Sequence, residues 1–448
     1  MATVTRPAGP STLAAFRAIV AGRRTDPDFF VRAARKHPRI AHVRLGSEHL
    51  YLLSHPDLVR RLLVDAGRTT TKSRGLQAAR RVLADGLLTS EDPLHHRQRR
   101  LVQPAFHAAR VASYAAGMVA AADSTAAGWR DGARIDIAAE MSALTFDAVG
   151  RALFSSDLRG AAGEVRAALG DLLSAYHRSF LPGFDLALRL GTPLGRRVTA
   201  AQARLDAVVA RIIAGHREQG ESADLLSALM AARDDDGGMD ERQLRDEVMT
   251  LILAGHETTA TTLTFVWHLL STHPAAERWL QEEIDEVIGA GTPAPADLGR
   301  LPRARSVVAE SLRLYPPAWV LGRRLTAEME VDGWLIPPGS TCLVSQWVLH
   351  RDPRFWSDPQ DFRPERWIGP SGGFDETAPG QPRYAFFPFG AGGRMCVGEP
   401  FAWTEAVLVL ARLARNWQPR HDPDHVLRLR PAITLRPDGA LPMTLVAR

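Results

Sequence analysis

One long helix constrains the fold of this chain more than any other feature of the sequence. The segment 240–272 reads as a continuous helix that Pro274 stops. At 1.5 Å per residue it would be roughly 45 to 50 Å long, enough to cross a whole domain. Its middle, 251–255, is apolar on all sides, and a helix that is hydrophobic all round is buried. We therefore expect the rest of the chain to surround this helix.

The part of the chain around this helix is expected to be mostly helical. Ala, Leu and Arg dominate 56–285, and strand signals there are few. Two strands precede it, at 40–45 and 50–53, with Gly46 at the turn between them. Residues 1–35 read as a polar lead-in followed by a short helix. Loops are marked by Gly and Pro pairs and by an acidic run, at 182–183, 191–193 and 234–238.

The pattern of residue types along the chain changes after the long helix. Further helices are expected near 275–288 and 306–314, and short strands with a Pro-Pro-Gly turn follow at 329–349. Residues 350–393 are rich in Pro, Gly and aromatic residues, and an irregular stretch of this length is usually functional. A last helix begins after Cys396, and the tail alternates like short strands.

These patterns predict one domain over 1–448 that is mainly α with small β-sheets (α+β), with 1–30 as a lead-in segment. The 448 residues are 45% hydrophobic and 23% charged, which favours a large core and excludes disorder for most of the chain. No apolar run approaches the ~18 to 20 residues that span a bilayer, and Arg17 interrupts the short apolar stretch 13–20. With neither a signal peptide nor a membrane anchor, we expect a cytoplasmic protein. We also expect a monomer.

The positive charge is spread along the chain and does not form a cluster. The formal net charge is +5, and arginine supplies nearly all of the cations because Lys36 and Lys72 are the only lysines. A nucleic-acid-binding protein would gather its cations in a patch, so this partner is not expected. A basic face for an acidic protein partner remains open.

The two cysteines, Cys342 and Cys396, are too few for a disulfide framework. Cys342 stands in an apolar strand-like run and is interpreted as a buried, inert thiol. Cys396 lies in the glycine-rich segment 389–398, whose glycines allow close backbone approach to a flat group. Backbone N–H groups and the start of the next helix would favour its thiolate. A phosphate-binding loop is not favoured, because no Gly-Lys-Ser/Thr follows.

A second group of polar residues, 254–259, lies midway along the long helix. An acid and two alcohols are costly in an apolar helix unless they are satisfied. Thr258 follows Ala254 by four residues, so its hydroxyl can bond to that carbonyl oxygen. A zinc site of the His-Glu-x-x-His type fails, because Ala260 stands where the second histidine is required. From the residues alone, an ordinary helix with locally satisfied polar groups remains the alternative.

The segment 389–398 resembles the complete haem-binding loop of the cytochrome P-450 family, Phe-Gly-x-Gly-x-Arg-x-Cys-x-Gly. The resemblance implies the fold of that family, with the long central helix over the haem. It also implies that Cys396 is the metal ligand, the axial thiolate on the iron of haem b. Phe389 would pack beside the sulfur, and Arg394 would pair with a haem propionate.

Three further motifs, all earlier in the chain than the cysteine loop, occur in the family's order. Segment 254–259 is similar to its dioxygen-binding stretch, which implies catalytic roles for Thr258 and Glu257: the first orients dioxygen and waters, and the second helps deliver protons. Glu310 and Arg313 would otherwise be a surface pair of little value. They resemble the Glu-x-x-Arg motif, which Arg366 would join to hold the cysteine loop in place.

The basic turn 95–100 reads on its own as a solvated helix face. In the family pattern, His95 and Arg99 reach haem propionates. Arg323 stands where another propionate-binding arginine is expected, although the adjacent Arg324 would also fit.

The resemblance implies a haem-thiolate monooxygenase that inserts one oxygen atom of dioxygen into a C–H bond. No flavin or iron–sulfur domain follows the last helix, so electrons are expected from a separate ferredoxin and its ferredoxin reductase. A haem-binding sensor or carrier, and an isomerase or peroxygenase on the same fold, are the alternatives. Intact Glu257 and Thr258 argue against them.

The expected pocket is apolar and carries no fixed charge, which favours a small hydrophobic substrate. We favour a compact terpenoid or other secondary metabolite over a fatty acid or a polyketide. The pocket positions are expected in the long helix, in the turn after 316–317 and in the tail, namely 252–254, Ala318, Trp319, Val320, Leu321 and the vicinity of Ala440.

Overall fold

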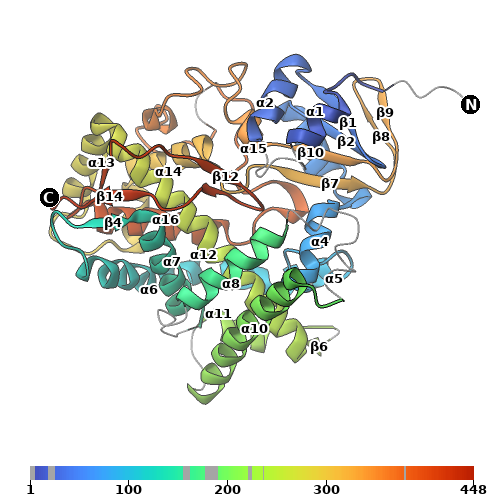
Figure 1. Ribbon diagram of the computed structural model, residues 1–448. Coiled ribbons are helices and arrows are strands. Elements are labelled where there is room, and N and C mark those ends of the chain that lie inside the picture. Colours follow the sequence, from blue (N-terminus) through green and yellow to red (C-terminus); the bar gives the residue numbers. More distant parts are fainter. Residues whose placement is uncertain are drawn as a thin grey trace, which may run out of the picture.

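The predicted long helix forms the centre of the molecule (Figure 1). Helix α12 spans Glu241–Thr272 in this computed structural model. It begins where the Asp240 side chain accepts a 2.7 Å hydrogen bond from the backbone N–H of Gln243, a helix N-cap. It ends before Pro274, at N1 of the next helix, where the missing N–H costs nothing.

The structure describes residues 6–18, 26–154, 162–176, 190–219, 224–235, 237–377 and 380–448. The expected loop at 182–183 lies outside these residues. Within them, no helix combines the length and the apolar character needed to cross a membrane. The helices are α1 Thr12–Phe16, α2 Pro27–Lys36, α3 Pro56–Arg60, α4 Arg74–Leu83, α5 Leu94–Val102, α6 Ala108–Ala127, α7 Ile137–Phe154, α8 Ala162–Tyr176, α10 Pro193–Gln219, α11 Leu225–Ala231, α12, α13 Pro274–Val287, α14 Pro302–Leu314, α15 Gln346–Leu349 and α16 Glu399–Ala414.

Helices α7, α14 and α16 surround the middle and second half of α12. At Gly255 a Cβ atom would lie 3.3 Å from Val149 Cγ2, so the glycine lets α7 approach α12 closely. The buried apolar side chains fall into two large clusters, one beside the first half of α12 and one beside its second half. The burial predicted for the middle of α12 is therefore confirmed for Leu251, Ile252 and Leu253.

The strands form small sheets, and the largest lies beside the first residues of the chain. Its order is β1-β2-β10-β7-β3, with β1 and β2 as the predicted hairpin around Gly46 (φ +62°). The described strands are β1 Ile40–Leu45, β2 Glu48–Leu53, β3 Thr70–Lys72, β4 Arg134–Asp136, β5 Arg233–Asp234, β6 Gly237–Gly238, β7 Leu321–Leu325, β8 Met329–Val331, β9 Trp334–Ile336, β10 Thr341–Val344, β11 Arg420–His421, β12 Leu429–Pro431, β13 Leu435–Pro437 and β14 Pro442–Thr444.

Three local predictions need correction. The strand-like run to residue 349 ends in a helical turn, α15, because the Ser345 hydroxyl caps it by accepting from the N–H of Val348. Leu321, expected in the turn after 316–317, instead begins strand β7, which lies between β10 and β3. The lead-in segment contains α1, which packs on β1 and buries Ala15.

The C-terminal residues return to the middle of the chain. Strands β12 and β13 pair as an antiparallel hairpin, with Arg430 opposite Arg436. The N–H of Leu435 donates a 2.9 Å bond to the Pro317 carbonyl oxygen. This hairpin, residues 429–437 (the C-terminal hairpin), contacts α12 and lies near the centre of the view (Figure 1).

Candidate active site

The cysteine loop, residues 389–398, is a tight turn that leads into α16. Gly390 (φ +76°) and Gly392 (φ +71°) adopt the left-handed conformation, and the Cys396 N–H donates a 2.9 Å bond to the Phe389 carbonyl oxygen. A Cβ atom at Gly392 would collide with the Leu63 carbonyl oxygen. Glycine is therefore required where the loop crosses residues 61–65.

Cys396 presents its side chain to open space on one side. Crowding by protein atoms on the other side raises the pKa of its thiol to about 11, while hydrogen bonds from the backbone N–H groups of Gly398 and Glu399 lower it in part. The two backbone N–H groups act in the expected direction, towards the thiolate, but burial outweighs them. Phe389 contacts Trp403 of α16, with ring centroids 5.8 Å apart.

Helix α12 has an opening in its otherwise buried middle. Ala254 is exposed although Leu253 before it and His256 after it are buried. Thr258 Oγ1 donates a 2.8 Å hydrogen bond to the Ala254 carbonyl oxygen, as predicted. His256 points elsewhere, because its Nδ1 lies 3.0 Å from the Ile252 carbonyl oxygen and its ring contacts Phe146. The free space beside Ala254 therefore adjoins the alcohol and not the imidazole.

Cations gather beside the cysteine loop, and Arg323 is the most deeply buried of the arginines there. Burial, with Arg394 nearby, lowers the pKa of Arg323 to about 10. Arg394 forms ion pairs with Glu91 at 2.6 Å and Asp92 at 3.2 Å. Arg99 Nη1 donates a 2.7 Å bond to the Met395 carbonyl oxygen. Desolvation and the neighbouring cations lower the pKa of His95 to about 4.

Arg323 and Arg324, the two candidate propionate ligands, lie side by side in strand β7. Arg324 Nη1 pairs with Glu48 at 3.2 Å, on the opposite face of the sheet from Arg323. Arg323 Nη1 donates a 3.1 Å bond to the Gly322 carbonyl oxygen, and its side chain is 8% exposed. A buried guanidinium without a carboxylate partner among the described contacts is suited to an anionic group.

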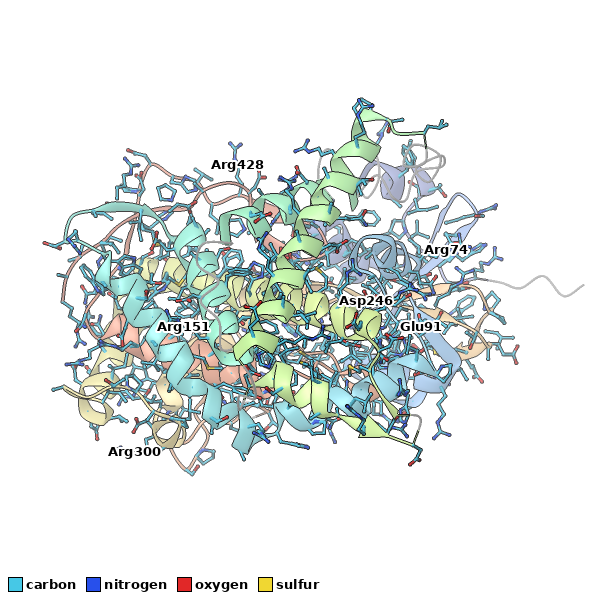
Figure 2. The ribbon with its side chains drawn as sticks, turned by 90° about the horizontal axis from the view of Figure 1, so that it is seen from below. Arg74, Glu91, Arg151, Asp246, Arg300 and Arg428 are labelled. Atoms are coloured by element: carbon cyan, nitrogen blue, oxygen red, sulfur yellow. The ribbon has the colours of Figure 1, made fainter. Side chains whose placement is uncertain are left out.

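Lys72 belongs to the same cluster, although no sequence motif pointed to it. Its ammonium donates to the carbonyl oxygens of Leu87 and Ser90, and burial together with Arg394 lowers its pKa to about 7. Lysine is rare in this chain, which was the only available signal. Figure 2 shows Glu91, which marks this cluster, on the side of the molecule opposite Arg151 and Arg300.

The Glu310–Arg313 pair is a buried network. Both side chains are fully buried, and Arg313 donates from Nε and Nη2 to the two Glu310 oxygens at 2.8 and 2.7 Å. Arg366 Nε reaches Glu310 at 3.1 Å, which confirms its predicted place, and Trp367 Nε1 donates to the same carboxylate at 2.9 Å. This network joins α14 to residues 363–367, upstream of the cysteine loop.

The sequence comparison decides the family. The family model described as Cytochrome P450 matches residues 7–440. This chain belongs to the cytochrome P450 family. It is 40% identical to cyclooctatin synthase of Streptomyces melanosporofaciens over 91% of this chain and 88% of that protein. It is 37% identical to cyclooctat-9-en-7-ol 5-monooxygenase of the same organism, over 89% and 86%. It is 34% identical to pentalenene oxygenase of Streptomyces avermitilis, over 92% and 94%.

The chain is therefore a cytochrome P450 monooxygenase, an oxidoreductase whose family uses haem iron with a cysteine thiolate ligand. The residues present fit that cofactor. Cys396 is exposed on one side, Ala254 is exposed within the otherwise buried middle of α12, and buried Arg323 offers a cation to a propionate. Cys396 would hold the iron, and the cation cluster would hold the carboxylates of haem b.

One contact in this P450 was not expected from the sequence. Glu257 Oε1 accepts a 2.7 Å hydrogen bond from Thr434 Oγ1, and Arg436 Nη1 lies 3.7 Å from the same oxygen. Both partners belong to the C-terminal hairpin, 177 residues away in the chain for Thr434. No local pattern could have predicted this contact.

One of the expected pocket positions in the P450 is wrong. Trp319 is buried against Phe30 of α2, with ring centroids 5.6 Å apart, so it belongs to the core. Ala440 is exposed and precedes Leu441, whose N–H donates to Asp136 Oδ1 at the end of β4. Ala318, Val320 and Leu321 remain partly exposed, and from the tail Ile433 packs against the apolar cluster that includes 251–253.

Proposed function

We propose that this P450 hydroxylates a compact terpenoid, and that Thr258 and Glu257 manage its protons. Insertion of one oxygen atom into C–H consumes dioxygen, two electrons and two protons, and the second oxygen atom leaves as water. The observation that carries the proposal is the alcohol–acid pair beside exposed Ala254 in a buried helix. A sensor or carrier has no use for such a pair.

The haem supplies dioxygen activation, and its thiolate ligand favours O–O cleavage. Cys396 would hold the iron, while His95, Arg99, Arg323 and Arg394 would hold the propionates, with Lys72 as a further cation. Phe389 would shield the sulfur. Thr258 Oγ1 donates its hydrogen bond to the Ala254 carbonyl oxygen, and the same oxygen atom can accept a hydrogen bond from a water molecule.

Glu257 would exchange protons between solvent and the Thr258 side of α12. Its side chain is 18% exposed, so water reaches it, while Leu251, Ile252 and Leu253 keep water from the apolar half of the helix. An acid that meets both water and the buried helix is suited to proton transfer.

The substrate class rests on the apolar lining and on the names of the relatives. Ala318, Val320, Leu321 and Ile433 offer no fixed charge to a carboxylate. Two relatives are named for oxidation of cyclooctat-9-en-7-ol and pentalenene. Purified protein should be titrated with these two compounds, palmitic acid and a macrolide, with the haem spectrum and the incorporation of labelled dioxygen as readouts. Turnover of only palmitic acid or the macrolide would replace the terpenoid by a fatty-acid or polyketide substrate.

We further propose a separate ferredoxin with its reductase as the electron source, and a monomeric, cytoplasmic enzyme. Exposed Arg61 and Arg68 flank the cysteine loop on one side, and exposed Met395 is part of the loop. This basic face suits an acidic protein partner, because attraction between opposite charges would accelerate association. Arg68→Glu should slow reduction by an acidic ferredoxin several-fold at low salt. Arg300→Glu is the control, because Figure 2 shows Arg300 on the opposite side of the view from Glu91, which marks the cation cluster. Equal rates in both variants would exclude this face.

A further inference from the structure

The C-terminal hairpin holds the acid of the central helix. Thr434 is 8% exposed and donates its hydroxyl hydrogen to Glu257 Oε1 at 2.7 Å. Arg436 Nη1 lies 3.7 Å from the same oxygen, with its side chain 25% exposed. One carboxylate oxygen therefore has a buried hydroxyl donor and a partly screened cation, both from one element.

The same hairpin is fixed to the turn that lines the expected pocket. Leu435 N–H donates to the Pro317 carbonyl oxygen at 2.9 Å, and Trp319 Nε1 donates to the Ala432 carbonyl oxygen at 3.1 Å. Trp319 is itself buried in the core against Phe30. These two hydrogen bonds, on either side of Thr434 in the chain, place it at a defined position against α12.

A glutamate on a helix surface has several rotatable bonds and occupies many positions unless it is held. Proton transfer requires donor and acceptor within hydrogen-bond reach, so a wandering acid transfers protons less often. The hydrogen bond from the Thr434 hydroxyl, which has a normal length, fixes one carboxylate oxygen of Glu257. The arginine adds attraction from the same side, weakened by its exposure to water.

We propose that Thr434 and Arg436 are positioning residues for Glu257, which fix its carboxylate for proton delivery towards Thr258. The inference rests on the proposed function, because it assigns these two residues to the proton path of that same site. Thr434 sets the orientation of the acid, and Arg436 keeps it on the hairpin side of α12. Neither residue itself transfers a proton.

The test compares Thr434→Val and Arg436→Gln with the conservative variants Thr434→Ser and Arg436→Lys. Arg430→Gln is the matched control, because Arg430 faces Arg436 across the hairpin. We expect product per reductant consumed to fall about fivefold in Thr434→Val and about twofold to threefold in Arg436→Gln, with peroxide making up the difference. The solvent deuterium isotope effect on turnover should rise in both. Thr434→Ser, Arg436→Lys and the control Arg430→Gln should retain wild-type values.

Two readouts separate positioning from other roles. Spectral Kd values for pentalenene or cyclooctat-9-en-7-ol should change less than twofold, and iodosylbenzene, which donates a single oxygen atom without this proton path, should give product at the wild-type rate. A tenfold weaker Kd with unchanged coupling would overturn the inference, since Thr434 would then be a substrate contact. Unchanged or improved coupling in Thr434→Val would overturn it too.

The outcome is distinguishable from failure of the proposed function. If the wild-type protein gives no product from either dioxygen or iodosylbenzene, the proposed function fails. A readout independent of turnover is the double-mutant cycle in melting temperature between Thr434→Val and Glu257→Gln. Coupling between the two sites supports the contact in solution, and additivity contradicts it.

Discussion

Thr258 Oγ1 donates a 2.8 Å hydrogen bond to the carbonyl oxygen of Ala254, one turn earlier on α12. That alanine is the exposed residue of a buried helical stretch. The threonine hydroxyl is thus held at the edge of the space beside the helix. The same type of bond recurs two turns later, where Thr264 Oγ1 donates to Ala260 at 2.7 Å.

Thr258→Ala should uncouple oxygen consumption from product formation. The variant should bind haem and substrate normally, because the lost bond is local. Without the alcohol, we expect product per reductant to fall roughly tenfold and peroxide to rise, a smaller change than the ~10²–10⁴-fold that a general acid or base contributes to a rate, because the ratio measures coupling and not rate. The oxygen electrode and product analysis measure this ratio. Thr264→Ala, which loses the matching bond in the core, should keep wild-type coupling. Equal coupling in both variants would remove Thr258 from the proton path.

Arg313→Ala should greatly reduce the yield of folded protein. The substitution strands the Glu310 carboxylate, which is fully buried, and the loss of one partner of a buried pair costs about 3 to 5 kcal/mol. Arg300 forms an exposed pair with Asp297 at the same i,i+3 spacing, so Arg300→Ala should cost about 1 kcal/mol or less. Chemical denaturation of both variants tests the difference. Similar free energies of unfolding would show that burial of the Glu310 pair adds nothing.

Arg323→Leu should weaken haem retention, and Arg324→Leu should not. Arg323 is buried beside the cysteine loop, whereas Arg324 pairs with Glu48 on the other face of β7. A charge-assisted hydrogen bond is worth about 1.5 to 3 kcal/mol, so haem transfer to apomyoglobin should accelerate by roughly tenfold or more. Faster transfer from the Arg324 variant instead would reverse the assignment.

Glu405 of α16 predicts a pH dependence of stability. Burial raises the pKa of this carboxyl to about 8 from its usual 4.5, and neither of its oxygens has a hydrogen-bond partner among the described residues. The folded protein therefore holds a proton that the unfolded chain releases, so this group lowers stability as pH rises from 4.5 through 8. Glu405→Gln should raise the melting temperature at pH 9 but change it little at pH 5. The same melting-temperature change at both pH values would mean that Glu405 is already charged when folded.

Local patterns predicted much of the site, and distant contacts limited the rest. Helix α12, the cysteine loop and the Thr258–Ala254 bond depend on neighbours within a few residues, so the sequence contains them. Strand alternation distinguishes Arg323 from Arg324, but only after β7 is recognised as a strand, and its preceding Pro-rich turn obscured it. The contact of Glu257 with Thr434 joins residues 177 apart. Such contacts depend on tertiary packing and leave no local pattern.

Trp319 is a residue whose predicted place in the pocket was wrong. An aromatic residue in a turn beside an apolar pocket was predicted to line it, but its ring packs on Phe30 and its Nε1 donates to Ala432. Large aromatic side chains bury the most apolar area, so packing in the core stabilises Trp319 more than lining the pocket would.

The central claim is that Cys396 is the thiolate ligand of the iron, and the spectrum of the reduced carbon-monoxide complex tests it most directly. Wild-type protein and Cys342→Ala should both show the red-shifted band of thiolate ligation, because Cys342 is buried in β10 and its thiol pKa is raised to about 12. Cys396→Ala, folded and loaded with haem, should lack that band. Retention of the band in Cys396→Ala, or its loss in Cys342→Ala, would contradict the account.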